Sequence, residues 1–241
     1  MKLDILAFGA HPDDVELSAG GTLAKHVDMG YKVGIIDLTP SQLSTRGTVE
    51  IRAKEAEEAR KALGVHVREN LGMQDGFFKI DEEHLTRVIR VIRKYKPAIV
   101  IANSPNDRHP DHGRGAALVK EANFLAGLVR VETDLDGQAQ EAWRAQALYH
   151  YIQFKHLEPD FVVDIRGYAE KKRESLAAYK SQFYNPESKE PTTIVSSKGF
   201  FDMIEGRKAV FGGMAALFEG EGFISELKPA VNDLFDLKGA L

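Results

Sequence analysis

The sequence predicts an α/β fold with a mainly parallel sheet, and three observations support this class. Short apolar runs alternate with longer segments of helical periodicity through residues 3–128. Glycine, proline and short polar stretches separate these segments, and two loops rich in His and Asp each follow directly on an apolar run. Strands that alternate with helices imply right-handed crossovers and a parallel sheet covered on both faces. We therefore expect a Rossmann-like three-layer sandwich.

The first half of the chain predicts a regular alternation of strands and helices. Apolar runs place strands at residues 3–9, 32–38, 65–71 and 98–102. Helical periodicity places helices at residues 17–29, 49–63, 82–95 and 113–128. Gly64 follows the second helix as a C-cap, and Pro97 ends the third.

Beyond residue 130 the pattern is weaker. Residues 131–144 are polar and acidic, which indicates a surface excursion. Further strands are predicted at residues 147–154 and 161–165, further helices at 168–183 and 199–217, and a loop at 185–197. Nothing marks a domain boundary, so we expect one domain over residues 1–241 with a small C-terminal α/β extension.

The composition is that of a globular protein without nucleic-acid or membrane character. The chain has 241 residues, 43% of them hydrophobic and 28% charged, and a net charge of −4. This charge leaves no basic excess to bind phosphates, so we expect no nucleic-acid partner. No apolar run approaches the roughly 20 residues that span a bilayer, and no signal peptide is apparent, which predicts a cytoplasmic protein. The absence of cysteine excludes disulfides and thiolate metal ligands.

Residues 10–16, AHPDDVE, form the first polar loop. The adjacent carboxylates of Asp13 and Asp14 repel each other and favour a nearby cation. His11 and Asp14 lie three residues apart, so a tight turn stiffened by Pro12 can direct both toward one ion. A simpler interpretation is an acidic turn that caps the following helix, because Asp is a favoured N-cap residue.

A second loop carries the same residue types as the first. Two such loops in one chain are hard to explain by chance. Residues 103–112, NSPNDRHPDH, follow the fourth predicted strand and lead into a helix. Three ligands of N and O type with one open position are the usual composition of a catalytic zinc site. His11, Asp14 and His112 supply such a set.

The remaining polar residues of the two loops predict acid–base chemistry. Asp13, next to the metal but not on it, can take a proton from the attacking water. His109 can stabilise the developing oxyanion, and Asp111 can hold His109 in the cationic form. Sites in open α/β sheets form at the carboxyl ends of strands where the winding reverses. The two loops therefore meet if the first and fourth strands are neighbours.

Three other functions fit these residues less well. Asp37 ends the second strand, where a ribose-binding acid would lie, but the first turn carries carboxylates in place of Gly-x-Gly-x-x-Gly and would repel a pyrophosphate. A phosphoester hydrolase usually has a two-metal acidic cluster, for which the spare carboxylates are too few. A non-catalytic sugar- or metal-binding module would not need Asp13, His109 and Asp111 besides the ligands.

The two loops resemble those of the PIG-L (LmbE-like) family of zinc-dependent N-acetylglucosamine deacetylases, over about residues 1–130. Within this family the chain looks most like the bacillithiol-type deacetylases, which act on N-acetylglucosaminyl-malate. That likeness rests on residues 37–39, 43–44, 47–52, 121–124, 179–183 and 221–223. Other N-acetylglucosamine derivatives, such as chitooligosaccharides, are the alternative substrates.

The resemblance implies a metal site formed by His11, Asp14 and His112, with Zn²⁺ or Fe²⁺ as the ion. It also implies Asp13 as the general base and His109 as the acid or oxyanion-stabilising residue. It also implies Arg52 and Asp75 as contacts to an amino-sugar substrate, and the planar fork of Arg52 would suit carboxylates. Relatives carry a Tyr after the glycine of the late loop, whereas Phe200 follows Gly199 here and cannot donate a hydrogen bond. A homo-oligomer, a hexamer by resemblance alone, is expected.

Overall fold

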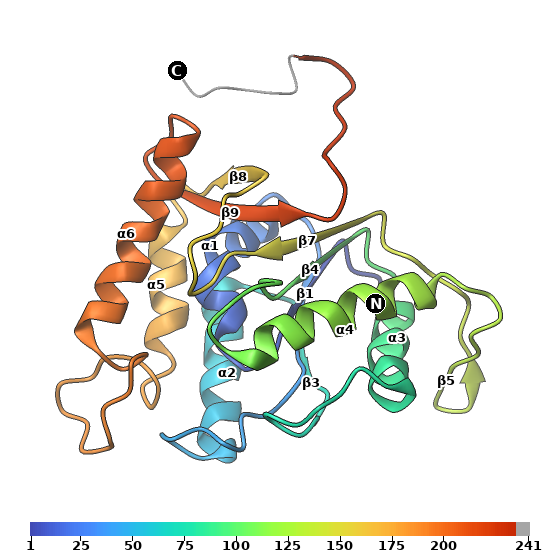
Figure 1. Cartoon of the computed structure of the whole chain (residues 1–241), viewed down its shortest axis with the longest axis horizontal. Helices are drawn as coiled ribbons and strands as arrows, with labels where there is room; N and C mark the ends of the chain where they lie inside the picture. Colours follow the sequence, from blue (N-terminus) through green and yellow to red (C-terminus); the bar gives the residue numbers. More distant parts are fainter. Residues whose placement is uncertain (235–241) are drawn as a thin grey trace.

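The computed structural model of the protein describes residues 1–234, so the last seven residues of the predicted domain, 235–241, lie outside the described part (Figure 1). The helices are α1 (Asp14–Asp28), α2 (Val49–Leu63), α3 (Glu82–Tyr95), α4 (Pro110–Ala126), α5 (Ala169–Ala177) and α6 (Lys198–Met214). The strands are β1 (Ile5–Gly9), β2 (Val33–Asp37), β3 (Val67–Asn70), β4 (Ile99–Ala102), β5 (Asp134–Leu135), β6 (Gln138–Ala139), β7 (Ala147–Tyr151), β8 (Phe161–Asp164) and β9 (Gly220–Ser225).

Seven of these strands form one sheet in the order β3-β2-β1-β4-β7-β9-β8. The strands from β3 to β7 in this order pair in parallel, whereas β9 runs antiparallel to both β7 and β8. The predicted α/β class with a mainly parallel sheet is confirmed. The winding reverses between β1 and β4, which are neighbours, so the two polar loops leave the same edge of the sheet.

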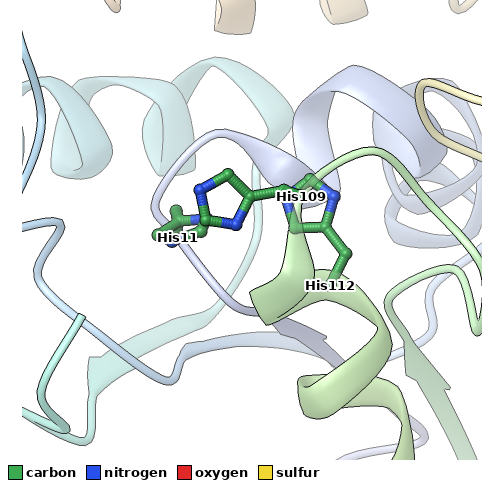
Figure 2. A group of neighbouring side chains, drawn as sticks. All are labelled: His11, His109 and His112. Carbon is green, nitrogen blue, oxygen red and sulfur yellow. The ribbon is translucent and has the colours of Figure 1, made fainter. Parts of the chain in front are cut away.

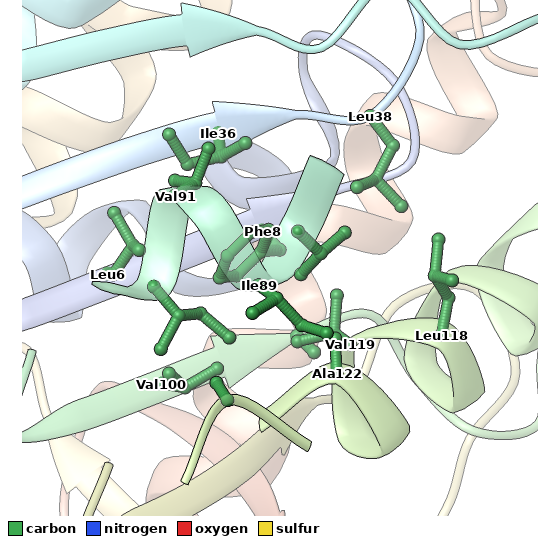
Figure 3. Packing of buried hydrophobic residues seen from close by; sticks show 14 of the residues in the cluster. Leu6, Phe8, Ile36, Leu38, Ile89, Val91, Val100, Leu118, Val119 and Ala122 are labelled. Atoms are coloured by element: carbon green, nitrogen blue, oxygen red, sulfur yellow. The ribbon is translucent and has the colours of Figure 1, made fainter. Parts of the chain in front are cut away.

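Apolar side chains on both faces of the sheet explain the layers. On one face α3 and α4 cover a cluster that includes Phe8, Val100 and Val119 (Figure 3). On the other face α1 and α2 contribute to a cluster that includes Ala7 and Leu23. Ala7 and Phe8 are consecutive on β1 and face opposite ways, as the alternation of a strand requires. Helix α5 packs on α1 and α2, and α6 packs on β9.

The structure departs from the predicted elements mainly in the C-terminal part and at helix starts. Helix α1 begins at Asp14 and α4 at Pro110, each three residues earlier than predicted, so both polar loops run into the first turn of a helix. Helix α5 ends at Ala177 rather than at residue 183. Strand β9 was not predicted, because two glycines in its sequence, GEGFIS, weaken the strand pattern. Within the described residues, no helix is both long and apolar enough to cross a bilayer.

Candidate active site

Both polar loops leave the carboxyl ends of neighbouring strands, which brings their side chains together. After β1 the chain turns sharply at Gly9, where a Cβ would lie 2.9 Å from the carbonyl oxygen of His11. Asp13 takes the N-cap position of α1 with a φ of 118°, in the region that favours glycine. After β4, His109 is the N-cap of α4 and Pro110 begins that helix. The first turns of two helices thus hold the predicted site.

His11, Asp14 and His112, the predicted metal ligands, lie close to one another. Oδ2 of Asp14 lies 3.6 Å from Nδ1 of His11, and Oδ1 of Asp14 lies 3.2 Å from Nε2 of His112. Ligands about 2.0–2.1 Å from a tetrahedral metal ion are roughly 3.3 Å from one another, close to both of these distances. The ring of His109 lies beside the other two imidazoles, and one nitrogen of each falls within 4.8 Å of the others (Figure 2).

Each of the two imidazoles predicted as ligands has a carboxylate on its other ring nitrogen. Nε2 of His11 lies 3.0 Å from Oδ1 of Asp75, and Nδ1 of His112 lies 2.6 Å from Oδ2 of Asp107. Carboxylates at this position fix the tautomer and the orientation of a metal-binding histidine. Asp75 lines the cavity, as a substrate contact would, but its carboxylate is engaged by His11 and by the backbone N–H of Leu43 at 2.9 Å.

Three donors hold the carboxylate of Asp14 in place. Its Oδ2 accepts the backbone N–H of His11 at 2.9 Å and Nδ2 of Asn103 at 3.0 Å. Its Oδ1 accepts Nε2 of Gln153 at 2.5 Å. The predicted site residues did not include Asn103, Asp107 or Gln153. The first two lie in the second polar loop, where their polarity directly after a strand was an available signal, but no local pattern points to Gln153.

The clustered carboxylates and imidazoles shift one another's pKa values. Burial alone would lower the pKa of His11, but the carboxylates of Asp111 and Asp14 help to raise it well above its usual value. Burial also lowers the pKa of His112, but the carboxylate of Asp14 helps to raise it, and the net result is a pKa of about 9. Conversely, burial would raise the pKa of Asp14, but both imidazoles hold it well below its usual range. This buried concentration of negative charge favours a bound cation.

Asp13 lies beside the ligands, and its carboxylate pairs with Arg52. Nη2 of Arg52 lies 2.9 Å from Oδ2 of Asp13, and Nε of Arg52 donates to the carbonyl oxygen of Pro12 at 2.9 Å. Burial raises the pKa of Asp13 to about 7, although the Arg52 cation lowers it. A carboxylate with this pKa is matched to proton transfer near neutral pH. Arg52 is therefore not the open fork for a substrate carboxylate that we expected, because two of its three nitrogens contact the Pro12 carbonyl and the Asp13 carboxylate.

The structure corrects the predicted pairing of His109 with Asp111. Nδ1 of His109 accepts the backbone N–H of Asp111 at 3.2 Å, so the neutral ring carries its proton on Nε2. Burial and the nearby imidazoles lower the pKa of His109, which favours this neutral form. The side chain of Asp111 instead accepts the backbone N–H of Gly76 at 2.8 Å and lies 3.5 Å from Nε2 of His11. Side chains two residues apart do not face each other in a helical turn, which explains the difference.

A cavity of about 540 Å³ opens over these residues, within the usual range for small-molecule sites. Polar side chains such as those of Asp13 and His109 line it, and the C-terminal part of the chain adds a wall with apolar side chains such as that of Ile194. In that wall the ring of Phe200 stacks between Phe154, with ring centroids 6.2 Å apart, and Phe183, at 6.5 Å. Phe200 therefore supplies an apolar surface to the cavity.

Comparison with known proteins agrees with this geometry. The PIG-L family, described as GlcNAc-PI de-N-acetylase, matches residues 6–123. A diacetylchitobiose deacetylase from Thermococcus kodakarensis is 30% identical over 189 residues, which cover 74% of this chain and 70% of that protein.

Solved structures extend the match to nearly the whole chain. A conserved protein from Thermus thermophilus aligns with a TM-score of 0.85 and 31% identity, over 96% of this chain and 98% of that one. The N,N′-diacetylchitobiose deacetylase from Pyrococcus horikoshii aligns with a TM-score of 0.80 and 25% identity, over 98% of this chain and 88% of that one. The predicted family and enzyme class are thus confirmed, and the chain belongs to the PIG-L family of de-N-acetylases.

Proposed function

We propose that the protein removes the acetyl group from an N-acetylglucosamine derivative by hydrolysis, with chitooligosaccharides such as N,N′-diacetylchitobiose as its first substrates. The observation that carries this proposal is the grouping of His11, Asp14 and His112, with Asp13 beside them, in the lining of one cavity. The two relatives named as diacetylchitobiose deacetylases support the substrate. The relatives reported above do not support the bacillithiol-type specificity that the sequence suggests.

The chemistry follows from the residues around the ligand cluster. A divalent ion, Zn²⁺ by the spacing of the donors, would be held by His11, Asp14 and His112 and would supply Lewis acidity at the acetamide. Asp13 accepts the proton of the attacking water, and Arg52 holds its carboxylate in position. His109 presents its Nε2–H toward the developing oxyanion or the leaving amine.

One observation favours N-acetylglucosaminyl-malate as a second candidate. Arg108 is exposed, lines the cavity and lies with its guanidinium carbon 5.0 Å from the ring centre of Phe154. Of the cavity's other arginines, Arg52 is paired with Asp13, and Arg46 donates to Ser188 and to two backbone carbonyl groups. Arg108 is thus the cation best placed to meet an acidic aglycone.

Amine release from a purified sample tests the proposal. We expect hydrolysis of N,N′-diacetylchitobiose, with a higher kcat/KM than for N-acetylglucosaminyl-malate. If the malate conjugate is the better substrate and Arg108→Ala abolishes only that advantage, the second candidate is correct and the deacetylase chemistry survives. If neither compound releases amine while the metal is bound, the proposed function is wrong.

Metal content tests the ligands separately from turnover. His112→Ala should lose the ion, measured as metal per chain by mass spectrometry. His26→Ala is the matched control, because Nδ1 of His26 lies 2.7 Å from the carbonyl oxygen of Thr22, within α1, and His26 is not part of the cavity lining. A full equivalent of metal in the His112 variant would refute the assignment. A cytoplasmic location and a homo-oligomeric assembly remain proposals from the sequence.

A further inference from the structure

One side of the cavity is formed by a segment with little packing of its own. Residues 184–195, which we call the strap, precede α6 and form irregular structure. All residues of the strap are exposed or half-buried, yet Thr193, Ile194 and Val195 line the cavity. Segments with few buried apolar side chains open more easily than the core of a protein. Polar contacts from the rest of the chain therefore matter for the position of the strap.

Arg46, in the loop between β2 and α2, supplies such contacts. Its Nη2 donates to Oγ of Ser188 at 2.8 Å, and its Nη1 donates to the carbonyl oxygen of Pro191 at 3.2 Å. Its Nε donates to the carbonyl oxygen of Ser181 at 2.6 Å, three residues before the strap. Arg46 is only 5% exposed, and an arginine is rarely buried to this extent unless it is paired. All three nitrogens of its guanidinium group thus hold the strap or the chain just before it.

The residue after Arg46 lets the two segments approach closely. The N–H of Gly47 donates to Oε1 of Glu190 in the strap at 3.0 Å. Gly47 has a φ of 70°, and a Cβ at this position would lie 2.8 Å from Oγ of Ser181, closer than side chains normally approach. Arg46 and Gly47 together therefore fasten the strap, and we call these two residues the latch.

The latch is connected to the predicted metal ligands. Leu43 belongs to the same loop as Arg46, and its N–H donates to Oδ2 of Asp75 at 2.9 Å. Oδ1 of Asp75 in turn lies 3.0 Å from Nε2 of His11. These contacts give the strap a defined position relative to the reacting centre, which is what a wall that orients a substrate requires.

Exposure indicates which part of a substrate the strap would meet. Leu43 and Ile194 both line the cavity and are 62% and 54% exposed, whereas His11 and Asp14 in the same lining are buried. A substrate whose acetamide lies at the buried residues would extend toward the exposed ones. In a disaccharide, the unit next to the reacting sugar would then lie toward the strap.

We propose that Arg46 is a positioning residue that holds the strap as a wall for the substrate unit next to the reacting N-acetylglucosamine. This inference rests on the proposed deacetylase function and adds a determinant of specificity to it. Without the latch, the wall would be in place for only part of the time, and the apparent affinity would fall by the same fraction. The chemistry would continue, because the guanidinium group of Arg46 donates to residues 181–191 rather than to the metal ligands.

The test measures kcat and KM for N,N′-diacetylchitobiose and for methyl N-acetylglucosaminide, which lacks the second sugar unit. In Arg46→Met, we expect KM for the disaccharide to rise about tenfold if the strap is in place in roughly one molecule in ten. The value of kcat should stay within about twofold, and so should KM for the methyl glycoside. Ser188→Ala should raise KM for the disaccharide by less, and should add little in the double variant, because both changes break the same contact.

Arg60→Met is the matched control. All three nitrogens of the Arg60 guanidinium group also donate, to Glu57 and to the carbonyl oxygen of Val65, but Arg60 is not part of the cavity lining. This variant should keep the wild-type KM for both compounds. Trypsin provides a readout without substrate, because Lys189 is exposed within the strap. Cleavage after Lys189 should be faster in Arg46→Met than in the wild type and unchanged in Arg60→Met.

The outcomes separate the latch from the proposed function. The inference is wrong if Arg46→Met leaves KM for the disaccharide unchanged, or if it alters both compounds to the same extent. If Arg46→Met does not fold, Ser188→Ala decides by the same criteria. If the wild type hydrolyses neither compound while the metal is bound, the proposed function is wrong and the substrate role of the strap is wrong with it. Cleavage after Lys189 then still shows whether Arg46 holds the strap.

Discussion

The floor and the wall of the cavity are built in different ways. The floor comes from the ends of β1 and β4, and each of its proposed metal ligands has a second polar partner, as His11 has Asp75 and His112 has Asp107. The C-terminal part of the chain adds a wall that holds apolar side chains, with stacked rings such as those of Phe154 and Phe200. Changes in the floor should therefore alter chemistry, and changes in the wall should alter stability or fit.

A buried ion pair within the C-terminal part lies against the helix that carries Asp14. Nζ of Lys172 on α5 lies 2.7 Å from Oε1 of Glu221 on β9. The carboxylate of Glu221 also accepts the backbone N–H groups of Gly21, at 3.1 Å, and Thr22, at 2.7 Å, both on α1. Because α1 carries Asp14 in its first turn, this contact ties the floor to the C-terminal part.

The largest expected effect is in the floor. Asp13→Asn should lower kcat by about 10²- to 10⁴-fold, because positioned proton transfer contributes that much, while the metal content stays unchanged. Asp28→Asn, at the exposed end of the same helix, is the control and should leave kcat unaltered. Near-normal turnover in the Asp13 variant would show that Asp13 is not the base. The floor and the wall would then differ less in their roles than we propose.

The next largest effect is on stability and concerns the buried pair of Lys172 and Glu221. Lys172→Met should lower the free energy of unfolding by about 3–5 kcal/mol, because Glu221 is left as a buried charge without its partner. Urea denaturation measures this loss. Lys171→Met changes the neighbouring lysine, whose partner Asp28 is exposed, and should cost under about 0.5 kcal/mol. Equal stabilities of the two variants would show that the pair does not hold the C-terminal part.

A third change tests the support of the floor. Asp107→Asn should weaken metal binding by about 10- to 100-fold, since His112 loses the carboxylate that orients it. Competition with a chelator measures this affinity. Asp136→Asn, in the exposed turn between β5 and β6, should bind metal as the wild type does. An unchanged affinity in the Asp107 variant would mean that His112 binds the metal equally well without this carboxylate.

The smallest effect is expected in the wall. Phe200→Leu should destabilise the protein by about 1 kcal/mol, because it removes the stacking with Phe154 and Phe183. The value of kcat per folded molecule should stay within about twofold. Phe218→Leu, at a ring that is 82% exposed, should change neither quantity. A large fall in kcat for the Phe200 variant would show that the wall takes part in the chemistry.

Much of the floor is visible in the sequence because its chemistry is local. His11 and Asp14 lie three residues apart after an apolar strand, and His112 follows the same pattern in the second loop. The strand–helix alternation of the first half also fixes a parallel sheet, since each short strand must return through a helix. The residue types, their spacing and their place after strands therefore determined the fold class and the candidate ligands.

Only the tertiary structure decided how these residues are supported. Arg52 reaches Asp13, and Gln153 reaches Asp14, across long stretches of sequence. The direction of the Asp111 side chain depends on where α4 begins, which the sequence placed three residues late. Strand β9 exists because β7 and β8 pair with it, although its glycines disfavour a strand. Such contacts join segments that lie far apart in the sequence, and no periodic pattern in the sequence indicates them. Packing and the register of the sheet therefore decide them.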